Sequence, residues 1–184
     1  SSAFFGCENL LSVSFPKCET IGRAAFGECT GLTSADFPSC TNIDSNAFYS
    51  CTGLTYAKFS VCTNVGVSAF ISCTSLTSID FPECTELSDY VFFNCPNLVS
   101  VNLPKCTSMD YHTFNSAGFS FVNLPQCTYV GNRVFMNCKK LASISLPVCT
   151  SIGTNAFHNC INLSYIDLPA CEQVGLGAFN QCYS

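Results

Sequence analysis

Residues 156–175, AFHNCINLSYIDLPACEQVG, show in full a unit that recurs along the chain. The clearest marker of this unit is a phenylalanine that returns every 22 residues, with one step of 21. The marker residues are Phe4, Phe26, Phe48, Phe70, Phe92, Phe114, Phe135, Phe157 and Phe179. A fixed period of roughly 20 to 50 residues is typical of a solenoid, in which each repeat buries its apolar face against the next.

Within the unit, apolar and polar residues alternate, which predicts a short strand with one buried face. The segment from Leu76 to Phe81 shows this alternation, and Pro82 then ends the strand because proline has no N–H to donate. The period predicts one short parallel strand per coil and about eight coils. The unbroken repeat favours a single domain over residues 1–184.

An apolar residue followed by glycine comes after the strand, as at Ile152 and Gly153. We expect this glycine where the backbone bends or enters the left-handed region, and Asp44 and Asp110 replace it in two coils. Residues 154–157 then predict a short helical or 3₁₀ turn that inserts the marker phenylalanine into the core.

All sixteen cysteines belong to two series with the period of the repeat. The first series is Cys7, Cys29, Cys51, Cys73, Cys95, Cys138, Cys160 and Cys182, and the second is Cys18, Cys40, Cys62, Cys84, Cys106, Cys127, Cys149 and Cys171. We expect both series to face inward as small apolar residues. The alternative is a disulfide scaffold, since neighbouring coils lie within disulfide range, but side chains in register oppose the required torsion. No cysteine or histidine spacing supports zinc.

The motif Ala-Phe-x-x-Cys followed by Leu-x-x-Ile-x-Leu-Pro, as between Ala156 and Pro169, resembles the BspA-like (Treponema pallidum type) class of leucine-rich-repeat proteins. The resemblance covers essentially residues 3–182. It implies a right-handed α/β solenoid, mostly β, without catalytic activity or cofactors. It also implies extracellular or cell-surface display and adhesion to host proteins or other cells. Members are often longer, so we expect this chain to be part of a longer array.

Charge and composition exclude several classes of function. The net charge is −5, and the seven Lys and Arg residues are scattered, so no basic stripe offers a nucleic-acid site. No apolar run is long enough to predict a membrane span. The only histidines, His112 and His158, occupy different phases of the unit, and no catalytic motif is present. We therefore expect no enzyme.

The outward positions of the predicted strands form a sheet face with two rows. One row is Ser14, Asp36, Lys58, Asp80, Asn102, Asn123, Ser145 and Asp167, and its neighbour is Ser12, Ser34, Tyr56, Ser78, Ser100, Phe121, Ser143 and Tyr165. We hypothesise that this face is a recognition strip for a protein or glycan on another cell or host surface. Tyr56, Phe121 and Tyr165 would be its anchors, with the polar row supplying hydrogen bonds. The alternative is a solvated sheet face.

One repeat is irregular. Between Phe114 and Phe135 one residue is missing, and Ala117 replaces the cysteine of the first series. Phe119 then takes the leucine position and Phe121 points outward. Either Phe119 fills the space left by Ala117 in a tolerated deletion, or a local bend presents Phe121, Tyr111 and His112 for binding.

The two ends suggest a second function. The chain opens at Ala3-Phe4 and closes at Ala178-Phe179 with ordinary core motifs rather than polar capping repeats. Uncapped solenoid ends expose strand edges and apolar surface, which can stack head to tail. Self-assembly into filaments is therefore the alternative function, and truncation from a longer array explains the same ends.

Overall fold

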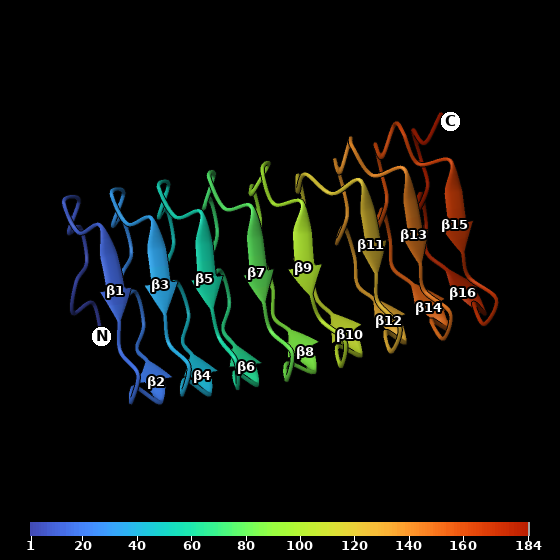
Figure 1. Cartoon of the computed structure of the whole chain (residues 1–184). Coiled ribbons are helices and arrows are strands. Elements are labelled where there is room, and N and C mark those ends of the chain that lie inside the picture. The colour runs from blue at the N-terminus through green and yellow to red at the C-terminus, as the bar shows by residue number, and fades with distance from the viewer. Residues whose placement is uncertain (184) are drawn as a thin grey trace.

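The computed structural model describes residues 1–183, in which 22-residue coils stack into a solenoid (Figure 1). Each coil contributes one strand of three residues and one of two residues. The three-residue strands are β1 (Ser12–Ser14), β3 (Ser34–Asp36), β5 (Tyr56–Lys58), β7 (Ser78–Asp80), β9 (Ser100–Asn102), β11 (Phe121–Asn123), β13 (Ser143–Ser145) and β15 (Tyr165–Asp167). The two-residue strands are β2 (Thr20–Ile21), β4 (Asn42–Ile43), β6 (Asn64–Val65), β8 (Glu86–Leu87), β10 (Ser108–Met109), β12 (Tyr129–Val130), β14 (Ser151–Ile152) and β16 (Gln173–Val174).

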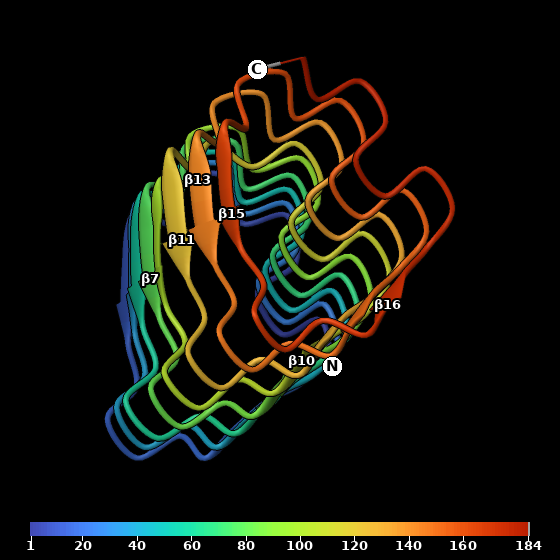
Figure 2. The same cartoon turned by 90° about the vertical axis from the view of Figure 1, so that its right-hand side faces the viewer.

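These strands form parallel sheets on two sides of the coil, seen end-on in Figure 2. The three-residue strands make the sheets β1-β3-β5-β7-β9 and β11-β13-β15, and the two-residue strands make β2-β4-β6 and β16-β14-β12-β10-β8. The prediction of a solenoid of parallel strands is confirmed. The prediction of one strand per coil is wrong, because the segment after the second cysteine is also extended and pairs between coils, as Asn42 does with Asn64.

The turn that carries Phe157 is not helical, which corrects the expectation of a helical or 3₁₀ turn there. The N–H groups of Asn155, Phe157 and Asn159 donate to carbonyls of the following coil at 3.0, 2.7 and 2.8 Å. The intervening N–H groups donate back within their own coil, as Ala156 does to Gly153 at 3.3 Å. A helix would use these donors internally, so sharing them with the next coil produces consecutive turns.

The glycine after the apolar anchor allows close packing rather than a left-handed backbone, which corrects a second expectation. A Cβ on Gly153 would lie 2.6 Å from the carbonyl carbon of Gly131 in the preceding coil. The left-handed residues come two and six positions later, at Asn155 (φ 55°) and Asn159 (φ 61°). Their equivalents in other coils include serine, glutamate and tyrosine, each at a cost of about 1–2 kcal/mol.

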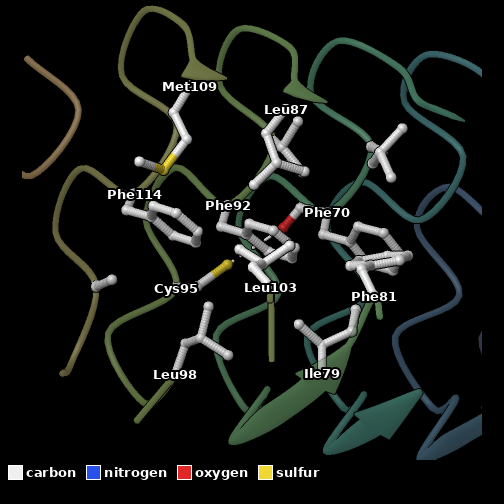
Figure 3. Close-up of a cluster of buried hydrophobic side chains, with 14 of the residues drawn as sticks. Phe70, Ile79, Phe81, Leu87, Phe92, Cys95, Leu98, Leu103, Met109 and Phe114 are labelled. Carbon is white, nitrogen blue, oxygen red and sulfur yellow. Dashed lines mark hydrogen bonds between the residues drawn. The ribbon is translucent and has the colours of Figure 1, made fainter. Parts of the chain in front are cut away.

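Two ladders of phenylalanine rings form the centre of the core (Figure 3). Phe70 stacks between Phe48 and Phe92, with ring centroids 5.1 and 5.5 Å apart. Phe59 and Phe81 belong to the second ladder and stack at 5.2 Å. The ladders meet edge to face, as Phe59 and Phe70 do at 5.8 Å. Such ring pairs add about 0.5–1.5 kcal/mol each beyond the burial of their apolar area.

All sixteen cysteines are free thiols; twelve are buried, while Cys7 is exposed and Cys18, Cys171 and Cys182 are half-buried. The inward orientation of both series is therefore confirmed away from the end coils. First-series thiols donate to a phenylalanine carbonyl of the preceding coil, as Cys51 does to Phe26 at 2.9 Å. Second-series thiols donate to the carbonyl two residues further along their own coil.

The buried thiols are protected from ionisation. Burial raises the pKa of Cys51 and of Cys95 to about 12 each, because a thiolate would lose its hydration in the apolar core. The thiolate is the reactive species, so these side chains are poor nucleophiles in the folded chain.

We expect thiol alkylation of the native protein to follow burial. N-ethylmaleimide at pH 8 should modify Cys7 first, then the three half-buried cysteines, and the twelve buried ones only after denaturation. Intact mass followed by peptide mapping measures this order, without reductant. Equal modification of all sites in the native chain, or thiols that stay unreactive in denaturant, would contradict the structure.

Candidate functional site

The outer face of the three-residue strands presents the sequence-predicted aromatic anchors to solvent. In β5 and β11 the first and third residues are exposed and the middle one is buried. Tyr56, Phe121 and Tyr165 are 39%, 53% and 62% exposed, as expected for outward strand positions. They lie on β5, β11 and β15, so other strands separate them. The face therefore carries three separate aromatic anchors rather than one cluster.

The polar row divides into a charged part and an uncharged part. Asp36, Lys58 and Asp80 are direct neighbours in the register of β3, β5 and β7, so a cation lies between two carboxylates. Asn102 on β9 and Asn123 on β11 follow as carboxamides. Ser145 comes next and Asp167 ends the row, on β13 and β15. The centre of the face is thus neutral.

The sheet divides at the same neutral place. In the described chain β9 pairs with β7 but not with β11, and β11 begins a new sheet (Figure 1). The missing residue lies between Ala117 and Phe119, so the turn leading into β11 is one residue shorter than its equivalents. On the other side of the coil, β10 and β12 remain paired. The deletion therefore separates β9 from β11 and leaves the pairing of β10 with β12 intact.

A cleft of about 460 Å³ lies at this opening. Ser100 and Asn102 line it from β9, and Phe121 and Asn123 line it from β11. None of the described residues that line it is charged. Its volume falls within the range of small-ligand sites, roughly 300–1,000 Å³. We take this cleft and the exposed row around it as the candidate site. Sequence reasoning singled out Phe121 but missed the cleft, whose only signal was the missing residue.

Both expectations for the irregular repeat can now be assessed. Phe119 is fully buried and packs edge to face on Phe114 at 5.2 Å, beside the buried Ala117, so the packing expectation is confirmed. Phe121 is exposed, as the binding alternative requires. Tyr111 and His112, however, follow β10 on a different side of the coil from β11 (Figure 2). The structure therefore does not combine them with Phe121 in one patch.

The BspA type leucine-rich repeat region matches the chain in six copies, over residues 1–118 and 107–184. The chain belongs to this family. Its members are typically non-catalytic binding proteins. No curated protein matches the chain in sequence.

Solved structures share the architecture of this BspA-type chain. The leucine-rich repeat protein of Treponema pallidum is 26% identical, with a TM-score of 0.77 over 93% of this chain and 85% of that protein. A leucine-rich repeat protein from Bacteroides ovatus is 21% identical, with a TM-score of 0.63. The match covers 98% of this chain but only 60% of that protein. A leucine-rich repeat protein from Eubacterium ventriosum is 22% identical, with a TM-score of 0.64 over 92% of this chain and 42% of that protein.

Two further features of the BspA-type chain concern ligands and membranes. Within residues 1–183, no cluster of three or more His, Cys, Asp and Glu side chains is placed to hold a metal ion. The same residues contain no helix that could cross a membrane.

A second cluster of aromatic side chains surrounds His112. Its ring stacks on Tyr90 with centroids 5.2 Å apart and meets Tyr111 edge to face at 4.1 Å. Arg133 lies over the Tyr111 ring and donates to its hydroxyl at 2.5 Å. The amide nitrogen of the buried Asn115 lies 2.7 Å from His112 Nδ1. An amide nitrogen can only donate, so Nδ1 accepts and the ring is neutral, with its proton on Nε2. Sequence reasoning missed this cluster, although Tyr90, His112 and Arg133 share one position of the repeat, two residues before a marker phenylalanine.

The surroundings of His112 predict that acid weakens the fold. Burial, and then the positive charge of Arg133, lower the pKa of His112 below its usual 6.5. Near that pH the unfolded chain binds more protons than the folded chain. The contribution of His112 to the unfolding free energy is therefore complete above about pH 6.5 and falls at lower pH. We expect the unfolding free energy, measured by urea titration, to decline more from pH 7.5 to 5.5 in the native chain than in His112→Asn. Asparagine suits the left-handed backbone at this position and does not ionise. Equal declines in both proteins would contradict the assignment.

Proposed function

We propose that the chain is a non-catalytic recognition module that binds a protein or glycan through the outer face of its three-residue strands. The observation that carries the proposal is Phe121, which is 53% exposed beside a neutral cleft where the sheet divides. Covering a large exposed aromatic side chain with a partner lowers the free energy of the complex, and such side chains dominate many interfaces. Tyr56 and Tyr165 extend the contact surface along the solenoid.

Rigidity supports the same proposal. Tyr56 and Phe121 stand on strands whose middle residues, Ala57 on β5 and Val122 on β11, are buried. The middle residue of β15, next to Tyr165, is half-buried. A ligand therefore meets side chains whose backbone is already ordered, which lowers the entropic cost of binding.

The resemblance to BspA-like proteins adds a location. We propose that the chain acts outside the cell or at its surface, on a ligand carried by another cell or a host.

Substitution of the three anchors tests this function. Tyr56→Ala, Phe121→Ala and Tyr165→Ala together should weaken binding at least tenfold, because each buried aromatic anchor contributes about 1–2 kcal/mol. The purified chain would be screened on immobilised extracellular-matrix proteins and glycans, and hits quantified by surface plasmon resonance. Tyr129→Ala is the matched control, because Tyr129 is 38% exposed but lies on β12 in the other sheet. If the triple variant binds like the native chain, the face is not the binding surface.

Self-association is a second candidate function, favoured by apolar exposure on the end coils. Leu11 near β1 is 66% exposed, and Leu176 after β16 is 84% exposed. Stacking two copies end to end would remove such apolar surfaces from water, which lowers the free energy. Sedimentation velocity over a concentration series, with negative-stain images, should show rods that grow with concentration and disappear in Leu176→Lys. Val61→Lys, on a 41% exposed position in a middle coil, is the control. A constant mass of 19.8 kDa would exclude this function for the chain.

A further inference from the structure

The cleft between β9 and β11 has a shape and a chemistry that select a particular ligand. We propose that it binds one uncharged sugar ring of a glycan chain, with the ring lying against Phe121. The inference rests on the proposed function, which places recognition on this face, and it adds the class of ligand and the site.

Backbone contacts at both ends of the opening limit its width. Before β11, the N–H of Gly118 donates to the carbonyl of Leu98 at 3.0 Å. After β11, the N–H of Thr128 donates to the carbonyl of Thr107 at 2.8 Å. The coils are therefore in ordinary contact on either side of the cleft. An inserted peptide strand would need β9 and β11 roughly 10 Å apart along its length, twice the usual strand spacing. The opening instead suits a compact group.

The polar groups at the cleft suit a ligand without charge. Ser100, Asn102, Ser120 and Asn123 line it, and each side chain both donates and accepts hydrogen bonds. Elsewhere in the row the positions equivalent to Asn102 and Asn123 include aspartate and lysine, but at the cleft both are carboxamides. A charged ligand would lose hydration here without gaining an opposite charge. A ligand rich in hydroxyl groups has no charge to desolvate, and its hydroxyl groups can exchange hydrogen bonds with these side chains.

Phe121 supplies the apolar half of the site. A sugar ring has one face of C–H groups beside its rim of hydroxyls. The face of an aromatic ring carries partial negative charge and attracts weakly positive C–H groups. Phe121 is 53% exposed at the edge of a cleft of about 460 Å³, so a ring can lie on it while its hydroxyls reach the serines and carboxamides.

Amide spectra of the ¹⁵N-labelled chain test the site directly. The probes are neutral oligosaccharides of hexose and N-acetylhexosamine units, together with their sialylated and sulfated counterparts. A neutral member should cause saturable shifts within residues 99–104 and 120–125. Phe121→Ala should lower its affinity at least tenfold, and so should Asn123→Asp, which keeps the shape and adds a charge. Tyr129→Ala is the matched control, since Tyr129 is a 38% exposed aromatic residue on β12, in the other sheet and away from the cleft. It should bind the neutral oligosaccharide like the native chain.

A cleft-closing variant provides an independent arm. Residues 117–119 would be replaced by the four residues Cys-Pro-Asn-Leu found at 95–98, which restores the 22-residue period. We expect β11 to pair with β9, sugar shifts to disappear, and thermal stability to be at least equal to that of the native chain. Loss of sugar binding with retained stability separates closure of the cleft from misfolding.

The outcomes distinguish the inference from the function on which it rests. Absence of saturable shifts at the cleft with every neutral probe overturns the inference. Tighter binding of the sialylated or sulfated probes there overturns it as well, and so does full sugar binding by a folded cleft-closing variant. A protein ligand that requires Phe121 while no sugar binds overturns the sugar site and leaves the recognition function intact. A ligand that is insensitive to all three anchor substitutions overturns the recognition function itself.

Discussion

Backbone hydrogen bonding between corresponding segments of successive coils is the constraint on which the rest of this structure depends. The turn at Phe48 shows it, since its N–H donates to the carbonyl of Ala69 in the next coil at 2.8 Å. A buried peptide group left without a partner costs about 1–3 kcal/mol. Each coil must therefore have the same length and path as its neighbours. The left-handed residues that shape the turns are tolerated because the bonds between coils offset their cost.

Equal path length also places like side chains above one another. Phenylalanine stacks on phenylalanine, and thiols recur at the same depth in successive coils. The one shorter coil cannot keep every bond, and the loss is concentrated at β11 instead of being shared along the chain. The same irregularity that weakens one sheet creates the cleft and exposes polar strand edges beside Phe121. The shorter coil thus loses hydrogen bonds that stabilise its neighbours and gains a surface that the other coils lack.

Much of this architecture could be predicted from the period, because each inward or outward position is repeated many times. The exposure of Tyr56 and the burial of Cys51 follow in this way. The two-residue strands could not be predicted, since a pair such as Asn42–Ile43 is too short to show alternation. The left-handed positions lacked a glycine signal, because residues such as Tyr90 occupy them. The cleft depends on where a missing residue breaks a hydrogen-bond ladder, which no local pattern encodes. A ligand likewise leaves no periodic trace in the sequence.

In nearly every coil the first-series thiol donates a hydrogen bond to a carbonyl of the preceding coil. The first cysteine series therefore forms a row of chemical probes at regular intervals. In a linear stack, coils can open from either end or from a weak point inside. A thiol becomes reactive only when its own coil separates from its neighbour. Labelling rates read along Cys29, Cys51, Cys73 and Cys95, and again from Cys138 onward, would map the opening free energy coil by coil. Ala117 interrupts the row at the coil where the sheet already divides, so Cys95 and Cys138 would report from either side of this boundary.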